Sequence, residues 1–386
     1  TGWYSSPNLR GTIDILWTCL FTIFLCCWTA IHPTIPSPSA TWKQTYLDRT
    51  IALLAGAIAP EIFIYEAFFE RLEARTMYTE PPGDRELDPD EQKWSMVHRF
   101  YAKMGGFCVT WKHETDSTET VKYGYLDARQ THFLLHDGVI DLDTFITQNE
   151  IRDKGKADGI IKTFTLLQIL WTLAQSIARR IQNMPLTTLE ITTLAYIPCA
   201  VCVVFLWWNK PYDVGVPTQI RLDVNPHSEL IITEKYNILP RTYKTFPMTY
   251  TCRATIKGAL APINRWGSIS SAVFAIVGGI HLSAWNSTFP TPFEKWAWRI
   301  CSLILATSIP ISWILTRLVV CVYQTIALDS WLISRRERIA AVIQGFGVGL
   351  YAVARMYLLV EVFLTLRVAP PGVYDTPDWT MFLPHV

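Results

Sequence analysis

The sequence predicts an all-α fold, a polytopic membrane helical bundle of about seven transmembrane helices with a small polar insert between the second and third helices. Half of the 386 residues are hydrophobic and only 17% are charged, whereas about 25% of the residues of a typical soluble domain are charged. The mean hydropathy is +0.19. Seven apolar segments approach the roughly 20 residues that a helix needs to cross the hydrocarbon core of a bilayer.

The predicted spans divide the chain into five parts. Residues 1–70 hold the first two helices, residues 71–158 form a polar membrane-associated insert, and residues 159–210 hold the third and fourth helices. A polar loop covers residues 211–262, and residues 263–386 hold the last three helices. In chain order, the predicted spans are Ile13–Ile31, Thr50–Phe69, Ile160–Ala178, Leu186–Trp208, Arg265–Trp285, Ala297–Ala327 and Ile339–Leu366.

Local signals refine two of these parts. Pro60 interrupts the second span, and because proline has no backbone N–H it is expected to kink the helix or to start a new segment. In the insert, Trp94–Met104 has the pattern of a short amphipathic helix. Phe107–Thr110, Val121–Tyr125 and Val139–Ile140 have the composition of short strands. Because the insert is short, we expect it to pack on the bundle and not to form an independent enzyme domain.

Positive charge near the span ends predicts the orientation. Lys and Arg are more frequent on the side that holds the insert, so the positive-inside rule places the insert and the N-terminus in the cytosol and the C-terminus in the lumen. Asn286, in the triplet Asn286-Ser287-Thr288, is then a lumenal N-glycosylation site. The predicted compartment is the endoplasmic reticulum. A cleaved signal peptide before Thr1 would invert this arrangement.

Motifs of the common soluble enzymes are absent from the sequence. It contains no Walker or Rossmann fingerprint and no nucleophile elbow. His132 and His136 have helical spacing but lack the glutamate of a zinc-protease motif, so neither a metal nor another cofactor is predicted. Most of the nine cysteines lie in predicted spans, which favours apolar packing. A net charge of +1 gives no reason to expect a nucleic-acid partner.

Ionisable residues inside the predicted spans are the candidates for function. Such groups are costly in a bilayer unless they face the bundle interior or a cavity, and a carboxyl group that stays protonated there can act as a general acid. The catalytic candidates are Glu61, Asp14 and Glu190. Structural pairing is the alternative for each, such as Arg355 with Glu361. The whole set is Asp14, Glu61, Glu66, Glu190, Arg317, Arg355 and Glu361.

Aromatic and polar side chains accompany these groups on the helix faces. Gln168, Trp171 and Gln175 recur at a spacing that places them on one face. Aromatic faces can stabilise a developing carbocation, so the pattern predicts a pocket for a lipophilic substrate. The candidate substrate-binding residues are Trp17, Trp28, Tyr65, Gln168, Trp171, Gln175, Trp313, Arg317, Tyr351 and Arg355.

Motifs along nearly the whole chain carry a family resemblance. They are Gly2-Trp3, Ser6-Pro7, Arg10-Gly11-Thr12-x-Asp14-Ile15-x-Trp17-x-Cys19, Cys27-Trp28-Thr29-x-x-His32, Ala59-Pro60-Glu61, Met104-Gly105-Gly106-Phe107, Asp153-Lys154-x-Lys156-x-Asp158 and Trp207-Trp208-Asn209-Lys210-Pro211. With them the chain resembles a large family of fungal integral membrane proteins. Some members are similar to the transmembrane terpene cyclases of fungal meroterpenoid pathways of the ascofuranone type. His32-Pro33-Thr34 departs from the family pattern, in which His-Leu-Asn is expected.

The resemblance implies a function in secondary metabolism. The similar cyclases protonate the terminal epoxide of a farnesyl-phenol and close a ring, so the chain is expected to cyclise an epoxidised prenyl-aromatic substrate. Glu61, Asp14 or Glu190 would donate the proton, and Arg317 and Arg355 would orient neighbouring groups. The expected partners are a lipophilic small-molecule substrate and membrane lipid. The alternative from another class is a non-enzymatic seven-helix receptor, channel or transporter.

Overall fold

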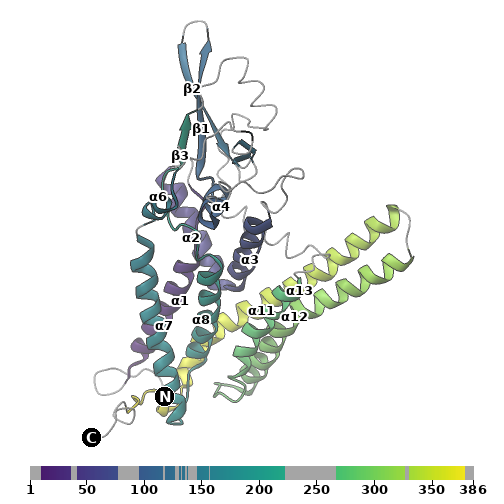
Figure 1. Cartoon of the computed structure of the whole chain (residues 1–386). Helices are drawn as coiled ribbons and strands as arrows, with labels where there is room; N and C mark the ends of the chain where they lie inside the picture. Colours follow the sequence, from purple (N-terminus) through teal and green to yellow (C-terminus); the bar gives the residue numbers. More distant parts are fainter. Residues whose placement is uncertain are drawn as a thin grey trace.

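Helices make up most of the computed structural model of the chain (Figure 1). Among the described residues, four helices are long and apolar enough to cross a membrane, or five if one bent pair is counted as a span. The four are α1 Thr12–Ala30, α8 Thr188–Leu206, α12 Pro292–Ile326 and α13 Ser330–Leu364. They agree with the predicted helical membrane protein, whereas the count of seven spans is not confirmed. The structure describes residues 10–35, 41–76, 95–115, 118–126, 130–131, 133–134, 137, 146–155, 157–221, 267–326 and 330–378.

Two further helices occupy the third and fifth predicted spans. They are α7 Ala157–Ile181 and α11 Gly267–Leu282. Neither is long and apolar enough to count as a span by itself. The 16 residues of α11 extend over about 24 Å, less than the roughly 30 Å of a bilayer core. The apolar sequence of α7 is interrupted by polar residues such as Gln168 and Gln175.

The second predicted span is a pair of helices joined by a sharp bend. Helix α2 runs over Trp42–Ile58 and α3 over Glu61–Thr76, and the two are bent by 113° at the break between them. The break coincides with Pro60, as expected for a residue that cannot donate the helical hydrogen bond. A side chain at Gly56 would overlap the ring of Phe63. Glycine at this position therefore lets α3 fold back closely against the end of α2.

Both arms of this α2–α3 hairpin reach the same end of the bundle. Arg49 of α2 forms an ion pair with Asp213, and Glu70 of α3 forms one with Lys210 at 2.7 Å. The bend lies deep in the bundle, where the Ala57 carbonyl accepts a hydrogen bond from Tyr196 in the middle of α8. The hairpin thus begins and ends at one end of the bundle, and the span predicted over Thr50–Phe69 is a bent pair of helices in place of one continuous helix.

The ends of the described chain also lie together. The Arg10 backbone N–H donates to the Tyr374 carbonyl oxygen at 2.9 Å, beyond two short 3-10 turns, Thr365–Val368 and Pro371–Val373. We call this end of the bundle the terminal end. Because the hairpin returns, the remaining helices α1, α7, α8, α11, α12 and α13 run between the ends an even number of times. The described chain thus begins and ends at the same end of the bundle, and the side of the membrane on which each terminus lies stays a prediction.

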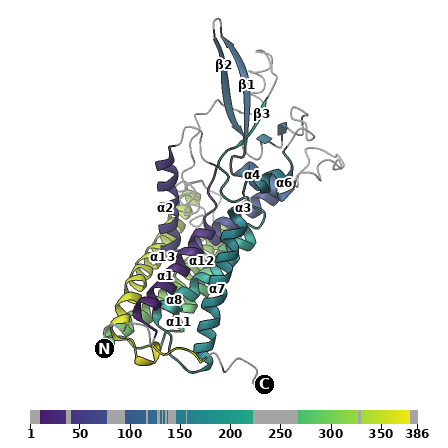
Figure 2. The same ribbon diagram turned by 90° about the vertical axis from the view of Figure 1, so that its left-hand side faces the viewer.

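A three-stranded sheet with α4 and α6 caps the other end of the bundle, which we call the insert end (Figure 2). Strand β1 pairs antiparallel with β2, and β3 from the second polar loop pairs parallel with β1. The two polar parts of the sequence thus build one unit, and the all-α prediction omits this sheet. The predicted strand Val139–Ile140 lies outside the described residues, as do His132 and His136. The elements are α4 Met96–Lys103, β1 Phe107–Thr115, β2 Thr118–Leu126, α6 Gln148–Asp153 and β3 Thr218–Arg221.

Small residues let the last three helices pack closely. A Cβ atom added at Gly278 of α11 would meet the backbone of α12 at Ala306, and one added at Gly347 of α13 would meet Ser312 of α12. Glycine at helix contacts is common in membrane proteins because it lets backbones approach. This packing positions His281 and Arg355, which lie further along α11 and α13, against the hairpin.

Candidate functional site

Arg355 caps the broken end of α2. Because α2 ends at Ile58 and Pro60 has no N–H, the last carbonyl oxygens of the helix lack helical partners. Arg355 Nε donates to the Ile58 carbonyl oxygen at 2.7 Å. The Tyr196 hydroxyl donates to the Ala57 carbonyl oxygen and accepts from Arg355 Nη2 at 2.9 Å. The guanidinium thus ties the hairpin bend to α8 and α13.

His281 of α11 provides another partner for this guanidinium. His281 Nδ1 lies 2.9 Å from the Val277 carbonyl oxygen and donates to it, so Nε2 is free to accept from Arg355 Nη1 at 3.2 Å. This pattern assigns the neutral ring with its proton on Nδ1. Trp298 Nε1 donates to the His281 carbonyl oxygen at 3.3 Å. His281 and Arg355 are both 0% exposed.

Glu61 faces the same group of side chains from the first turn of α3. The Tyr351 hydroxyl donates to Glu61 Oε2 at 3.0 Å, and Tyr351 lies one helical turn before Arg355 on α13. Glu61 is 1% exposed, and its Oε1 has no hydrogen-bond partner in the described residues. A buried carboxyl oxygen without a partner is unusual in a folded protein. We call the apex cluster the residues Glu61, Tyr196, His281, Tyr351 and Arg355.

A second polar group stabilises the terminal end. Arg10 forms an ion pair with Glu190 at 2.7 Å, and Glu190 Oε2 accepts from the Thr187 backbone N–H at 2.8 Å. Glu190 therefore caps the first turn of α8. The buried Arg179 donates to the carbonyl oxygens of Pro185, Gly372, Val373 and Asp375. These contacts fasten the C-terminal segment to α7, which is a structural role.

A third polar layer lies at the insert end. Lys210 pairs with Glu70 and lies 4.1 Å from the centre of the Trp207 ring. The His32 ring packs 4.8 Å from the centre of the Trp207 ring and 5.2 Å from that of Tyr212. Burial, followed by the positive charges of Lys210 and Lys162, holds the pKa of His32 well below 6.5. The imidazole is therefore neutral at physiological pH.

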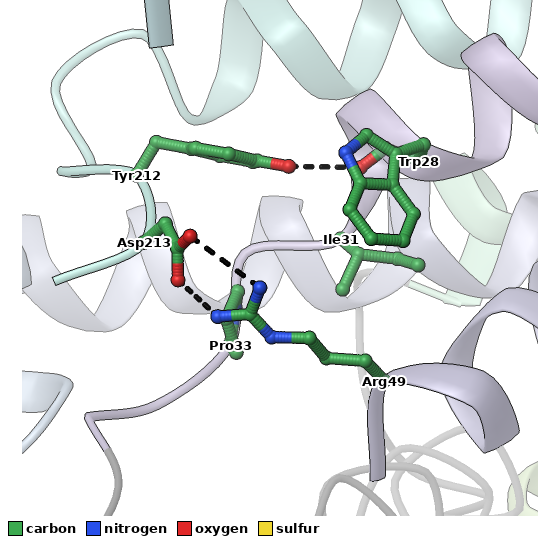
Figure 3. Close-up of a pocket in the computed structure, with 6 residues that line it drawn as sticks. All are labelled: Trp28, Ile31, Pro33, Arg49, Tyr212 and Asp213. Atoms are coloured by element: carbon green, nitrogen blue, oxygen red, sulfur yellow. Dashed lines mark hydrogen bonds and ion pairs between the residues drawn. The ribbon is translucent and has the colours of Figure 1, made fainter. Parts of the chain in front are cut away.

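A small surface pocket opens beside this layer (Figure 3). The Tyr212 hydroxyl donates to the Trp28 carbonyl oxygen at 3.4 Å, and Arg49 and Asp213 pair across the opening. Ile31 and Pro33 complete the lining. Trp28 is the one candidate substrate-binding residue in this lining. The pocket brings an indole and a phenol ring next to an ion pair.

A protein-family profile covers most of the chain. The family is described as "Family of unknown function (DUF8562)", and it matches residues 1–234 and 264–386. The chain belongs to this DUF8562 family. No curated protein and no solved structure matches the chain. All five residues of the apex cluster lie inside the matched ranges of the DUF8562 family.

The apex cluster unites three of the residues that the sequence singled out. Glu61 comes from the second predicted span, Tyr351 and Arg355 come from the seventh, and the three meet through the contacts above. The other two catalytic candidates do not join them. Asp14 has an exposed side chain and accepts from the Gly11 backbone N–H at 2.8 Å, which caps α1. Glu190 belongs to the terminal end, as described above.

The predicted pocket wall on α7 does not face the apex cluster. Gln168 Nε2 donates to Thr22 Oγ1 of α1 at 3.0 Å, Trp171 is 49% exposed, and Gln175 is half-buried. Of the three residues predicted to share one face of this helix, Gln168 thus contacts α1, whereas Trp171 lies on the outer surface. The three form no wall with Glu61 in the described residues.

The remaining substrate-binding candidates lie on outer faces or in local contacts. Trp17 is 68% exposed on α1, and Tyr65 packs against Phe69 at 4.3 Å between ring centres. On α12, Trp313 is half-buried and Arg317 is exposed. The glycosylation candidate Asn286 has an exposed side chain whose Oδ1 accepts from Arg299 at 3.4 Å.

Two members of the apex cluster were missed in the sequence. Both His281 and Tyr196 lie in apolar helices without an amphipathic pattern around them. For His281 a usable signal exists, because an ionisable residue inside an apolar span is a functional candidate by itself. Tyr196 offers no comparable signal, since tyrosine is common at the ends and in the interior of membrane helices.

Proposed function

We propose that this protein is a membrane-bound cyclase that opens an epoxide by general acid catalysis and closes a ring on a prenylated aromatic substrate. The observation that carries the proposal is the carboxyl group of Glu61. It is buried where the hairpin bends, one oxygen accepts from Tyr351, and the other has no partner in the described residues. A carboxyl group with one oxygen available is what proton donation to a substrate requires.

The surroundings of Glu61 suit this role. Protonated Glu61 gives its proton to the epoxide oxygen while the carbon–oxygen bond breaks, and an alkene or hydroxyl group of the substrate attacks the opened carbon. The carboxylate that remains is stabilised by the Tyr351 hydroxyl, by the N-terminal end of α3 and by the positive charge of Arg355. When the ring closes, the substrate returns one proton to the Glu61 carboxylate, so the reaction is an isomerisation.

The substrate class follows from the position of the group. An acid inside a membrane bundle is reached by a lipophilic molecule, which enters from the bilayer, more readily than by a polar one. Aromatic side chains such as Tyr196 and Tyr351 lie in the cluster, and aromatic faces stabilise positive charge. The family resemblance is the reason that we propose a prenylated aromatic compound as this lipophilic substrate. Asp14 and Glu190 each accept hydrogen bonds that cap a helix, so we assign the acid to Glu61.

We further propose an arrangement in the membrane with six crossing helices and the α2–α3 hairpin as a re-entrant element. Both arms of the hairpin then add positive charge to the insert end, which places this end in the cytosol and both termini in the lumen of the endoplasmic reticulum. Asn286 remains lumenal. Lys and Arg of the described residues near the insert end include Lys43, Arg49, Arg71, Arg75, Arg99, Lys103, Arg152, Lys154, Lys162, Lys210, Arg335, Arg336 and Arg338; those near the terminal end are Arg10, Arg179, Arg180, Lys295, Arg299 and Arg367.

The test is conversion of a candidate substrate. The chain is expressed in a fungal host, farnesyl-phenol epoxide is fed, and extracts are compared by LC-MS with those of the empty host. We expect a new isomer of unchanged mass, and we expect Glu61→Gln to abolish it. Glu294→Gln is the matched control, since Glu294 is half-buried at the terminal end and glutamine can keep its helix cap. Full conversion by Glu61→Gln would exclude Glu61 as the acid.

One observation favours a second candidate, a transporter or channel. Non-helical backbone at membrane depth occurs where it is buried in protein or lines a pathway, and the bend between α2 and α3 is such a place. Arg355 caps the carbonyl oxygen of Ile58 there, and a fixed arginine opposes the passage of cations. Flux of an anion through liposomes containing the purified protein, together with loss of this flux in Arg355→Met, would favour this candidate over the cyclase.

A further inference from the structure

The surface pocket beside Trp28 combines an ion pair with aromatic side chains (Figure 3). Arg49 Nη1 donates to Asp213 Oδ2 at 3.4 Å and Nη2 donates to Oδ1, so the two charged groups meet through two parallel hydrogen bonds. The rings of Trp28 and Tyr212 line the same opening. We call this site the interfacial pocket; its lining is Trp28, Ile31, Pro33, Arg49, Tyr212 and Asp213.

The loop that carries Asp213 into the pocket is held in a defined conformation. The backbone of Asp213 has a φ of 52°, which residues other than glycine seldom adopt and which recurs at ligand-binding sites. A Cβ atom added at Gly155 would lie 2.9 Å from the Tyr212 carbonyl oxygen, so the two segments pack directly on each other. The family motifs over residues 153–158 and 207–211 thus meet beside this pocket, and the proposed cyclase uses neither of them.

The pocket lies at the level where lipid headgroups are expected. It adjoins the insert ends of α1 at Ala30 and of α8 at Leu206, two helices that are long and apolar enough to cross a membrane. Tyr46 precedes Arg49 by about one helical turn, Trp208 follows the end of α8, and both aromatic side chains are exposed. Exposed Trp and Tyr are enriched at the interface between hydrocarbon and water.

An exposed apolar stripe leads away from the pocket along α1. Leu20, Phe24 and Trp28 are spaced by four residues and therefore share one face. Leu20 and Phe24 are exposed, and Phe24 stacks on Trp28 with 5.7 Å between ring centres. The pocket has a volume of about 210 Å³ counted to its open mouth, less than the roughly 300–1,000 Å³ of pockets that enclose a whole drug-sized ligand. It therefore suits one end of a longer molecule whose apolar part lies on the stripe.

The ion pair selects the charge of that end. A group with both a phosphate and an ammonium can replace the pair and leave neither Arg49 nor Asp213 without an opposite charge. An anionic headgroup would pair with Arg49 but would place a second negative charge beside Asp213. Arg49 Nε is buried and has no partner in the described residues, so a further donor remains for a phosphate oxygen. Aromatic rings such as those of Trp28 and Tyr212 attract a quaternary ammonium group.

We propose that the interfacial pocket binds the headgroup of phosphatidylcholine from the leaflet at the insert end. The phosphate pairs with Arg49, and the trimethylammonium group pairs with Asp213 beside the rings of Trp28 and Tyr212. The bound lipid joins α1, α2 and the loop after α8. This inference uses the proposed membrane arrangement but not the cyclase, because no residue of the pocket belongs to the apex cluster and no covalent bond changes.

The test is lipid binding to the purified, delipidated full-length protein in detergent, measured by native mass spectrometry. The probes are phosphatidylcholine, phosphatidylethanolamine and phosphatidylglycerol with the same acyl chains, and soluble phosphocholine. We expect one phosphatidylcholine to bind about tenfold more tightly than phosphatidylglycerol. Asp213→Asn keeps the side-chain size and tolerates the same backbone conformation, so it should reverse this preference. Glu73→Gln removes the carboxylate of another ion pair at the insert end and is the matched control, expected to bind like the wild type.

Two further variants complete the test. Arg49→Gln should weaken the binding of both lipids, and it decides the question if thermal unfolding shows that Asp213→Asn does not fold. Trp28→Leu should bind phosphatidylcholine and phosphatidylethanolamine equally, whereas the wild type should prefer phosphatidylcholine.

Three results would overturn the proposal. They are equal binding of the three lipids by the wild type, an unchanged affinity in Arg49→Gln, and soluble phosphocholine that binds as tightly as the lipid, which would assign the pocket to a soluble ligand. Lipid binding needs no epoxide substrate, so it is independent of the cyclase test. Selective binding without cyclisation would support the pocket and reject the cyclase, and cyclisation without selective binding would do the reverse.

Discussion

Replacement of Arg355 by methionine provides a direct test of the apex cluster. Methionine fills part of the volume of the arginine side chain but donates no hydrogen bond. The change removes the donors to the Ile58 carbonyl, to His281 Nε2 and to Tyr196 Oη; the first of these hydrogen bonds is partly buried and the other two are buried. It also removes the positive charge beside Glu61.

The magnitude follows from what is left behind. A buried acceptor that loses its donor costs about 1–3 kcal/mol. The Ile62 N–H, which would bond the Ile58 carbonyl in an unbroken helix, donates to the Ala59 carbonyl instead and does not replace the lost donor. Removal of one member of a buried charged network typically costs about 3–5 kcal/mol. Because these effects overlap at one residue, we expect Arg355→Met to destabilise the protein by about 3–5 kcal/mol. Arg355→Lys keeps the positive charge but cannot form all three hydrogen bonds of the guanidinium group. We therefore expect it to lower the free energy of unfolding by less than Arg355→Met does.

The assay is unfolding of the purified protein by titration from a mild detergent into SDS, followed by circular dichroism. Arg317→Met is the matched control, because Arg317 is exposed on α12 and a substitution on such a surface changes stability by about 0.5 kcal/mol or less. If both variants lose less than about 1 kcal/mol, Arg355 does not hold the hairpin and the apex cluster is not the centre of the fold.

Three more predictions concern the hairpin, the insert end and the helix packing. Cysteines introduced at Lys43 and at Arg75, beside the outer ends of α2 and α3, should react with a membrane-impermeant maleimide from the same side of sealed microsomes; labelling from opposite sides would show a crossing. Because the folded-state pKa of His32 is lowered, stability should fall as the pH drops below about 6.5, and unfolding at about pH 5 should show His32→Phe to be less acid-sensitive than the wild type. Gly278→Ala should cost about 1–3 kcal/mol by pushing α11 from α12, whereas Gly279→Ala, with open space around it, should be neutral or stabilising in the same measurement.

Local sequence patterns predicted several elements of the fold. Pro60 marks the end of α2 because the missing N–H is a property of one residue. The amphipathic pattern over Trp94–Met104 corresponds to α4, and the strand signals that begin at Phe107 and Val121 correspond to β1 and β2. Each of these signals depends on neighbours within a few residues. The partner of β1 from a distant loop, β3, had no such signal.

The candidate site could be predicted residue by residue but not as a group. Glu61, Tyr351 and Arg355 stand out because ionisable and hydroxyl groups are rare in apolar helices. Glu190 stood out for the same reason, yet it belongs to an ion pair with Arg10. Which acid faces a tyrosine and which faces an arginine depends on the rotation of each helix about its axis. That rotation is set by packing against other helices and cannot be obtained from spacing along one of them.

Taken alone, the sequence determined that the chain is helical and apolar, where its helices break, and which side chains would be costly in a membrane. The tertiary structure decided that α2 and α3 form a hairpin with both outer ends at one end of the bundle, that Arg10 lies beside Tyr374, and that Glu61 and Arg355 belong to one cluster at the bend. The physical reason is that hydrophobicity and backbone hydrogen bonding act over a few residues, so they can be seen in the sequence. The direction of a helix after a proline depends on contacts with residues far away in the sequence. Here α3 is held by Lys210 and α2 by Asp213, and Arg355 bonds the free carbonyl oxygen at the bend.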